Sequence, residues 1–186
     1  MTVWIMHMPM KEQEENALMQ LTELPLPFGD LPDLSTVNNG REFKRLISLL
    51  QVDTPPETIE RLHDKIWTIL SELQPEDIIV LPLQHKRVVA VAEISGRYSY
   101  AKDEGSKAHR IAVKWHEKTI PFIRFRLHKS LIESKEWSIA ELKDQSARAI
   151  IQLRLPYKYN RFAKVKWIAS VFILWQALQM LLRLKS

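Results

Sequence analysis

Glu133 and Lys135 have the Glu-x-Lys spacing of a nuclease metal site, and they are the residues that most resemble a catalytic pair in this sequence. Such a site also needs an acidic partner on a preceding strand, because the metal ion requires several oxygen ligands. The sequence offers no suitable partner, and the segment around Ser134 lacks the alternation of a strand. We therefore expect no nuclease centre here.

Other groups capable of catalysis or metal binding are scattered or absent. The chain has no cysteine, which excludes thiol nucleophiles and cysteine-based metal sites. Its 4 glycines form neither G-x-G-x-x-G nor G-x-x-x-x-G-K-[ST], so a phosphate-binding glycine loop is missing. The six histidines show no metal-ligand spacing, and we expect most of them at the surface: His7, His63, His85, His109, His116 and His128. We predict a protein that is not an enzyme and that holds no metal or cofactor, with His109 a candidate contact to phosphate or base.

Charge divides the chain into two parts of opposite sign. Residues 1–75 carry 6 Lys and Arg against 12 Asp and Glu, whereas residues 76–186 carry 21 against 10. A basic surface attracts polyanions such as nucleic acid or anionic lipid. A polyanion-binding surface is therefore expected in the second part.

Length and composition indicate one folded domain with an appendage. The chain has 186 residues, of which 46% are hydrophobic and 26% charged, as in ordinary globular proteins. We place a domain at residues 1–155 and a basic linker with an apolar helix at residues 156–186. No secretory signal is visible, so we expect a cytoplasmic protein.

The N-terminal part of the chain should contain one strand, a shaped loop and two helices. Residues 1–8 alternate loosely and predict a strand, and an acidic segment of uncertain structure follows. Prolines from Pro25 to Pro32 should exclude both helix and sheet pairing. Apolar spacing predicts a helix over residues 43–50 and a second one that is capped by Thr54 and ended by Pro75.

The middle of the chain is rich in β-forming residues. Residues 78–83 and 88–94 predict a hairpin, and Ser95-Gly96 should interrupt the second strand before it continues to Tyr100. Further strands are expected at residues 110–115 and near residues 120–122. Ser138-Ile139-Ala140-Glu141 matches a capping box and predicts a last helix that runs to about Ile150.

Three stretches in this order and spacing resemble an EVE domain of the PUA-like superfamily, as found before the nuclease domain in Mrr-like restriction proteins. They are Phe28-Gly29-Asp30-Leu31-Pro32-Asp33-Leu34-Ser35, residues 73–82 (LQPEDIIVLP), and residues 88–100 (VVAVAEISGRYSY) followed by residues 109–115 (HRIAVKW). The resemblance covers about residues 1–150. It implies an α+β fold in which helices pack on a small curved β-barrel. It also implies an aromatic pocket that holds an extruded, chemically modified base.

The resemblance assigns the pocket position by position. Phe28 falls where relatives usually have the tryptophan of a Gly-Trp-Gly turn, with Gly29 after it, and Pro27 replaces the first glycine. Phenylalanine keeps a stacking face but loses the indole N–H, so the pocket is expected to be altered. The other matching aromatic residues are Trp67, Tyr98, Tyr100 and Trp115.

Stacking on aromatic side chains would stabilise the extruded base by about 1–3 kcal/mol, which offsets part of the free energy that extrusion costs. Basic residues near the pocket would neutralise flanking phosphates, and the candidates are Arg97, Lys102, Lys107, Arg110 and Lys114. A structural role is the alternative for Trp67, which lies on an apolar helix stripe, and for Trp115.

The most apolar stretch is residues 167–182, which are 16 residues long. A helix of that length spans about 24 Å, less than the roughly 30 Å of a bilayer core. Basic residues flank the stretch, and Trp167 stands where an interfacial aromatic would, so membrane association is one interpretation. Docking of its apolar stripe on the domain, on a second copy or on a partner is another, and a truncation remnant is a third.

The preferred hypothesis from the sequence is a non-catalytic reader of modified bases in DNA, with RNA less favoured. It would act by base flipping in a restriction or anti-phage defence system whose effector nuclease is another chain. The alternative is a protein-interaction or membrane-tethered scaffold that keeps the fold and no longer binds bases.

Overall fold

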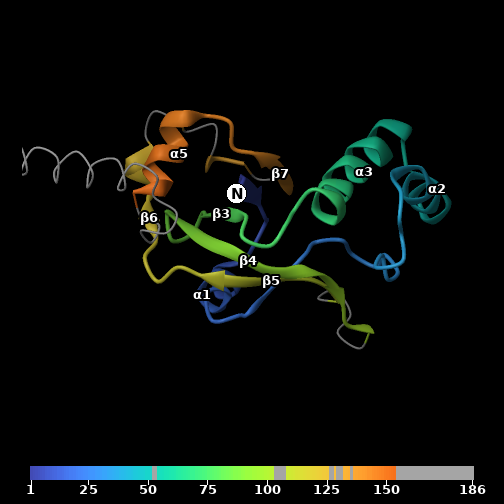
Figure 1. Cartoon of the computed structure of the whole chain (residues 1–186), viewed down its shortest axis with the longest axis horizontal. Helices are drawn as coiled ribbons and strands as arrows, with labels where there is room; N and C mark the ends of the chain where they lie inside the picture. Colours follow the sequence, from blue (N-terminus) through green and yellow to red (C-terminus); the bar gives the residue numbers. More distant parts are fainter. Residues whose placement is uncertain (52–53, 103–107, 126–127, 129–131, 135, 154–186) are drawn as a thin grey trace, which may run out of the picture.

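The computed structural model describes residues 1–51, 54–102, 108–125, 128, 132–134 and 136–153. It shows a mixed α+β protein, as the sequence predicts (Figure 1). The predicted helix at residues 167–182 and the candidate Lys107 lie outside the described residues. Within them, no helix is both long enough and apolar enough to cross a membrane.

One mixed sheet forms the centre of the domain. Its strands are β1 (Val3–His7), β2 (Glu23–Pro25), β3 (Ile78–Leu83), β4 (Val88–Tyr100), β5 (His109–Trp115), β6 (Ile120–Pro121) and β7 (Ser138–Glu141). They pair in the order β2-β5-β4-β3-β1-β7, with β6 paired to β4. Among the described strands, only the β1–β3 pair is parallel. The order is open, with β2 and β7 as its outer strands in the described part of the chain.

Four helices and one short 3-10 turn complete the described fold. They are α1 (Glu12–Leu18), α2 (Gly40–Leu50), α3 (Pro56–Ser71), η2 (Phe122–Phe125) and α5 (Gln145–Gln152). α2 and α3 form the predicted helix pair at one end of the molecule (Figure 1). The Asn39 side chain caps α2 by accepting a hydrogen bond from the Glu42 N–H at 2.9 Å. The predicted cap of α3 is wrong, because Pro55 precedes the helix and the Thr54 hydroxyl bonds Gln51 instead.

Both faces of the sheet are buried, which explains the unbroken apolar runs of β1 and β3. On one face Ile79 and Leu81 join the larger core with α1, α2 and α3. On the other face Ile78 and Val80 pack against η2 and α5. Alternate residues of one strand therefore serve two separate cores. In Figure 1, α1 and α5 accordingly lie on opposite sides of the central strands.

The predicted hairpin of β3 and β4 is confirmed, but β4 is not interrupted at Ser95-Gly96. It runs on to Tyr100, and its register with β5 shifts between Ile94 and Tyr98. Such a bulge bends a strand and increases its local twist. Gly96 lies inside the bulge, where an added Cβ would meet Cβ of Ala112 at 3.0 Å. A side chain at this position would push β5 away, so glycine allows the close approach of β5.

Two other expectations about secondary structure are corrected. Residues Ser138–Glu141 form β7, which pairs antiparallel with β1, and the last helix starts only at Gln145. Asp144 caps that helix with its side chain, whereas the Ser-x-x-Glu pattern had indicated a start at Ser138. Pro25 also takes part in a strand, opposite Arg110, where an outer position tolerates the missing N–H.

Candidate functional site

Phe28, Tyr98 and Tyr100 come together around a buried histidine. The ring of Phe28 lies 6.3 Å from that of Tyr98 and 5.2 Å from that of His109. His109 in turn lies 5.0 Å from Tyr100. The pairing of β4 with β5 places Tyr98 and Tyr100 beside His109, and Phe28 of the proline-rich loop packs on Tyr98 and His109. Three of the aromatic residues assigned by resemblance therefore form one cluster.

A chain of hydrogen bonds fixes this cluster to the proline-rich loop. The Leu34 N–H donates to the hydroxyl of Tyr98 at 3.2 Å, and that hydroxyl lies 2.8 Å from Nδ1 of His109. Nε2 of His109 lies 2.8 Å from the carbonyl oxygen of Leu31. Because a carbonyl only accepts, Nε2 carries the proton and Nδ1 accepts from the Tyr98 hydroxyl. Each group in the chain is then satisfied.

Burial tunes both titratable groups of the chain. It raises the pKa of Tyr98 to about 12, and the hydrogen bond from Leu34 opposes this only in part. Burial also lowers the pKa of His109, whose side chain is 0% exposed. His109 is thus a neutral structural residue, and the expectation that it contacts a phosphate or base from the surface is wrong.

A small cavity lies beside Tyr98, which is one of its lining residues. It has a volume of about 270 Å³ and is enclosed by the loop at Leu34, the end of α3 and the bulge of β4. Leu34 and Ile69 give it an apolar floor. Polar side chains also line it, from Ser35, Ser71, Gln74, Arg97 and Tyr98.

Phe28 itself is packed rather than open. Its side chain is 5% exposed, and the ring of Trp137 lies against it at 5.8 Å in an edge-to-face arrangement. Lys65 holds Trp137 by donating to its carbonyl oxygen at 2.7 Å and by lying 5.4 Å from the ring centre. Gly29 follows in the left-handed region, with φ 64°, which glycine adopts without strain. Phe28 and Gly29 therefore shape the loop beside the cavity.

Trp67 and Trp115 lie apart from the aromatic cluster. Trp67 is half-buried between α2 and α3, with its ring 6.4 Å from His63 and 6.1 Å from Phe43. The indole N–H of Trp115 donates to the carbonyl oxygen of Leu21 at 2.8 Å. Each tryptophan has a packing role in this arrangement.

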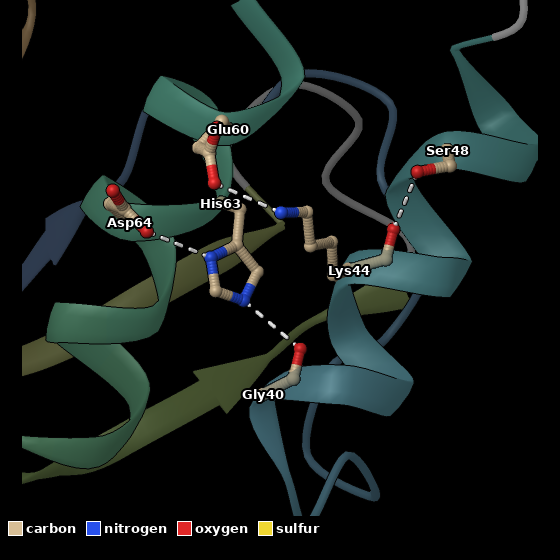
Figure 2. Close-up of polar contacts among 6 residues, drawn as sticks. All are labelled: Gly40, Lys44, Ser48, Glu60, His63 and Asp64. Atoms are coloured by element: carbon tan, nitrogen blue, oxygen red, sulfur yellow. Dashed lines mark hydrogen bonds and ion pairs between the residues drawn. The ribbon is translucent and has the colours of Figure 1, made fainter. Parts of the chain in front are cut away.

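Polar contacts hold α2 against α3 around Trp67. Figure 2 shows His63 of α3 pointing toward the first residue of α2, with Nε2 3.0 Å from the carbonyl oxygen of Gly40. Its Nδ1 lies 2.9 Å from Asp64, and an ion pair of 3.0 Å joins Lys44 to Glu60 across the two helices. These contacts hold α2 on α3, and the C-terminal end of α3 borders the cavity.

The candidate phosphate-binding residues differ in availability. Arg97 and Lys102 are exposed and form no ion pair with other described residues. Arg110 is half-buried and pairs with Glu23 at 3.0 Å, while Lys114 stands opposite Glu93 in the register of β4 and β5. Arg97 and Lys102 are therefore the cations best placed for an external anion.

Trp137, which packs against Phe28, was not predicted from the sequence. Its indole Nε1 is buried and has no hydrogen-bond partner among the described residues. No strand was expected near it, so nothing in the local pattern connected it to Phe28. Lys135 of the Glu-x-Lys pair lies outside the described residues. Among those that are described, no group of three or more His, Asp or Glu could hold a metal ion.

The fold and site define an α+β domain with an aromatic cluster and a small polar cavity at the bulge of its central hairpin. In a comparison with known families, residues 4–135 match a domain of unknown function, DUF8426, and the chain belongs to this family. No curated protein and no solved structure gives a match.

Proposed function

We propose that this protein is a non-catalytic nucleic-acid reader that takes up one extruded base, with modified cytosine in DNA as the preferred ligand. The observation that carries the proposal is the cavity of about 270 Å³, which has the Tyr98 side chain in its wall and Arg97 at its edge. The curved, open sheet is proposed to be a variant of the PUA-like barrel.

The size and chemistry of the cavity support a single heterocycle. Its volume lies just below the roughly 300–1,000 Å³ of typical ligand pockets, so it favours one ring system over a whole nucleotide. Ser35, Ser71 and Gln74 supply donors and acceptors for a base edge. Stacking on Tyr98 would stabilise the base by about 1–3 kcal/mol, enough to offset much of the cost of flipping.

In this proposal the other residues either support the cavity or contact the phosphates of the nucleic acid. Phe28 and His109 keep the loop at Leu34 in place, so that the cavity exists before ligand binds. Arg97 and Lys102 contact the phosphates beside the flipped base, a role that needs exposed cations rather than paired ones. A separate chain supplies any nuclease activity, as in a restriction or defence system.

A scaffold that binds no base is the second candidate, and the packing of Phe28 favours it. The ring of Trp137 packs in an edge-to-face arrangement against Phe28, the residue that the resemblance assigns to the base pocket. Arg110 and Lys114 also have acidic neighbours, which reduces the positive field of that surface. Protein or membrane contacts would then be the function of this chain.

Binding to matched duplexes separates the two candidates. The duplexes carry unmodified, methylated or hydroxymethylated cytosine, and affinity is measured at several salt concentrations. A reader prefers one duplex, and Arg97→Ala lowers its affinity and reduces the salt slope by about one. Arg124→Ala is the matched control, since Arg124 is exposed on η2, away from the cavity. Equal affinity for all three duplexes, unchanged by Arg97→Ala, would support the scaffold.

A further inference from the structure

An apolar groove lies beside α1, on a different part of the molecule from the cavity at Tyr98. It consists of two hollows of about 410 and 840 Å³ that share Met8, Pro9, Met10 and Glu14. The smaller hollow continues along α1 to Ala17 and Leu21 and reaches Pro27 of the proline-rich loop. We call these two hollows the α1 groove.

The walls of the α1 groove are preformed. The buried carboxylate of Glu15 accepts hydrogen bonds from the backbone N–H groups of His85 and Lys86, each at 3.1 Å. These bonds fasten α1 to the turn between β3 and β4. Leu18 of the same helix is 2% exposed and anchors it in the core. A ligand therefore meets a fixed helix and not a loose one.

The surface of the α1 groove suits an apolar helix. Leu21 is 40% exposed, and Pro9 and Ala17 are exposed as well. Met8 and Met10 have flexible thioether side chains that adapt to the shape of an apolar partner. Apolar surface of this kind, left open to water, is typical of an interaction site.

The charges that line the α1 groove indicate which charges the ends of its partner should carry. Glu14 and Glu133 line the groove, with Lys11 as the one basic lining residue among those that the structure describes. In the sequence, the apolar stretch of residues 167–182 is preceded by Lys164 and Lys166 and is followed by Arg183 and Lys185. An apolar segment with basic ends is complementary to an apolar groove with an acidic rim.

We propose that the α1 groove binds the apolar segment 167–182 of the same chain. The 13 residues 154–166 connect it to the last described residue and, at ~3.5 Å each, reach up to about 45 Å. A compact domain with a radius of gyration of about 15 Å is roughly 40 Å across, so the extended linker is about as long as the domain is wide. A tether that spans the distance makes docking an intramolecular event, which favours the segment over a free partner. The inference is independent of the proposed function.

Crosslinking in the full chain tests this directly, because the protein has no cysteine and every introduced thiol is unique. The test variant combines Ala17→Cys in the α1 groove with Val171→Cys on the apolar stripe, and a short bismaleimide is the crosslinker. One control places the second thiol off the stripe as Gln176→Cys. The other moves the first thiol to α2 as Leu49→Cys, a position that is 67% exposed. Circular dichroism checks that each variant folds, and Pro9→Cys replaces Ala17→Cys if that variant does not.

The expected result is an internally crosslinked monomer that forms about tenfold more in the test variant than in either control. Four results would overturn the proposal. A crosslink between two chains assigns the groove to a second copy. Equal yields in test and controls show that the segment does not dock. Absence of any crosslink from protein found in the membrane fraction assigns the segment to a bilayer, and absence from soluble protein leaves the groove without this occupant.

Discussion

The hydroxyl of Tyr98 and Nδ1 of His109 are 2.8 Å apart, and this contact joins two strands to a loop that is far away in the sequence. Tyr98 lies on β4 and His109 on β5, while their other hydrogen bonds reach Leu34 and Leu31. The pair replaces the regular pairing that the proline-rich loop lacks. It therefore determines the shape of the loop wall of the cavity.

Removing the hydroxyl of Tyr98 should destabilise the protein while its ring remains in place. Tyr98→Phe leaves the N–H of Leu34 and Nδ1 of His109 without a partner, and we expect a loss of about 1–3 kcal/mol in the free energy of unfolding. Urea denaturation measures this. Tyr100→Phe is the control, with an expected change within about 0.5 kcal/mol, because no hydrogen bond of its hydroxyl is found in the described part of the chain. Equal losses in the two variants would contradict the structural role of the Tyr98 hydroxyl.

Stability should fall as the pH drops below the ordinary pKa of histidine. Burial lowers the pKa of His109 below 6.5, so between the folded and unfolded pKa values the unfolded chain binds more protons. The free energy of unfolding therefore decreases as pH falls through this window, and the decrease ends below the folded pKa. Urea denaturation from pH 7.5 to pH 5, with NMR titration of the His109 ring, measures both effects.

His85→Gln provides the control for this pH dependence, since His85 is exposed and its Nε2 lies 3.2 Å from the carbonyl oxygen of Met10. This variant retains His109 and both hydrogen bonds of its ring, so a pH slope that arises from His109 persists in it. An NMR titration of His109 at or above the ordinary histidine value would show that the imidazolium form is tolerated inside the fold.

The local sequence pattern was sufficient to predict those helices and strands whose formation is determined by neighbouring residues. The helix over residues 43–50 and the hairpin of β3 and β4 were predicted because periodicity and turn residues lie within a few positions of each other. Ser138–Glu141 shows the limit of that method. The same four residues satisfy a capping box and a short outer strand, and only the free edge of β1 decides between them.

The site shows the same division between local and long-range information. The order of motifs predicted Tyr98, Tyr100 and Phe28 as one group, and the structure brings them together. The buried ring of His109 is hydrogen-bonded to the carbonyl oxygen of Leu31, which is 78 positions away in the sequence. The residues next to His109 therefore did not predict its burial. Trp67 of α3 packs against Phe43 of α2 and against His63 of its own helix. The contact with α2 is a tertiary contact, so the residues next to Trp67 did not predict it.

The carboxylate of Asp77 should be essential for the N-terminal strand. It is buried and accepts hydrogen bonds from the N–H of Thr2 at 2.6 Å and from the indole of Trp4 at 3.1 Å. Asp77→Ala leaves these donors unsatisfied, and we expect a loss of about 2–4 kcal/mol in the free energy of unfolding. A double-mutant cycle with Trp4→Phe isolates the indole bond, and exact additivity would mean that it contributes nothing.

Gly96 should tolerate no side chain unless β5 makes room for it. Its added Cβ would meet Cβ of Ala112 at 3.0 Å, closer than ordinary van der Waals contact. We expect Gly96→Ala to cost about 1–3 kcal/mol in the free energy of unfolding, the usual range for overpacking. Ala112→Gly removes the opposing Cβ, so the double variant should recover part of this loss beyond the sum of the single changes. Urea denaturation of the four proteins in the cycle measures the coupling, and a coupling of zero would mean that strain at the bulge comes from the backbone and not from these two atoms.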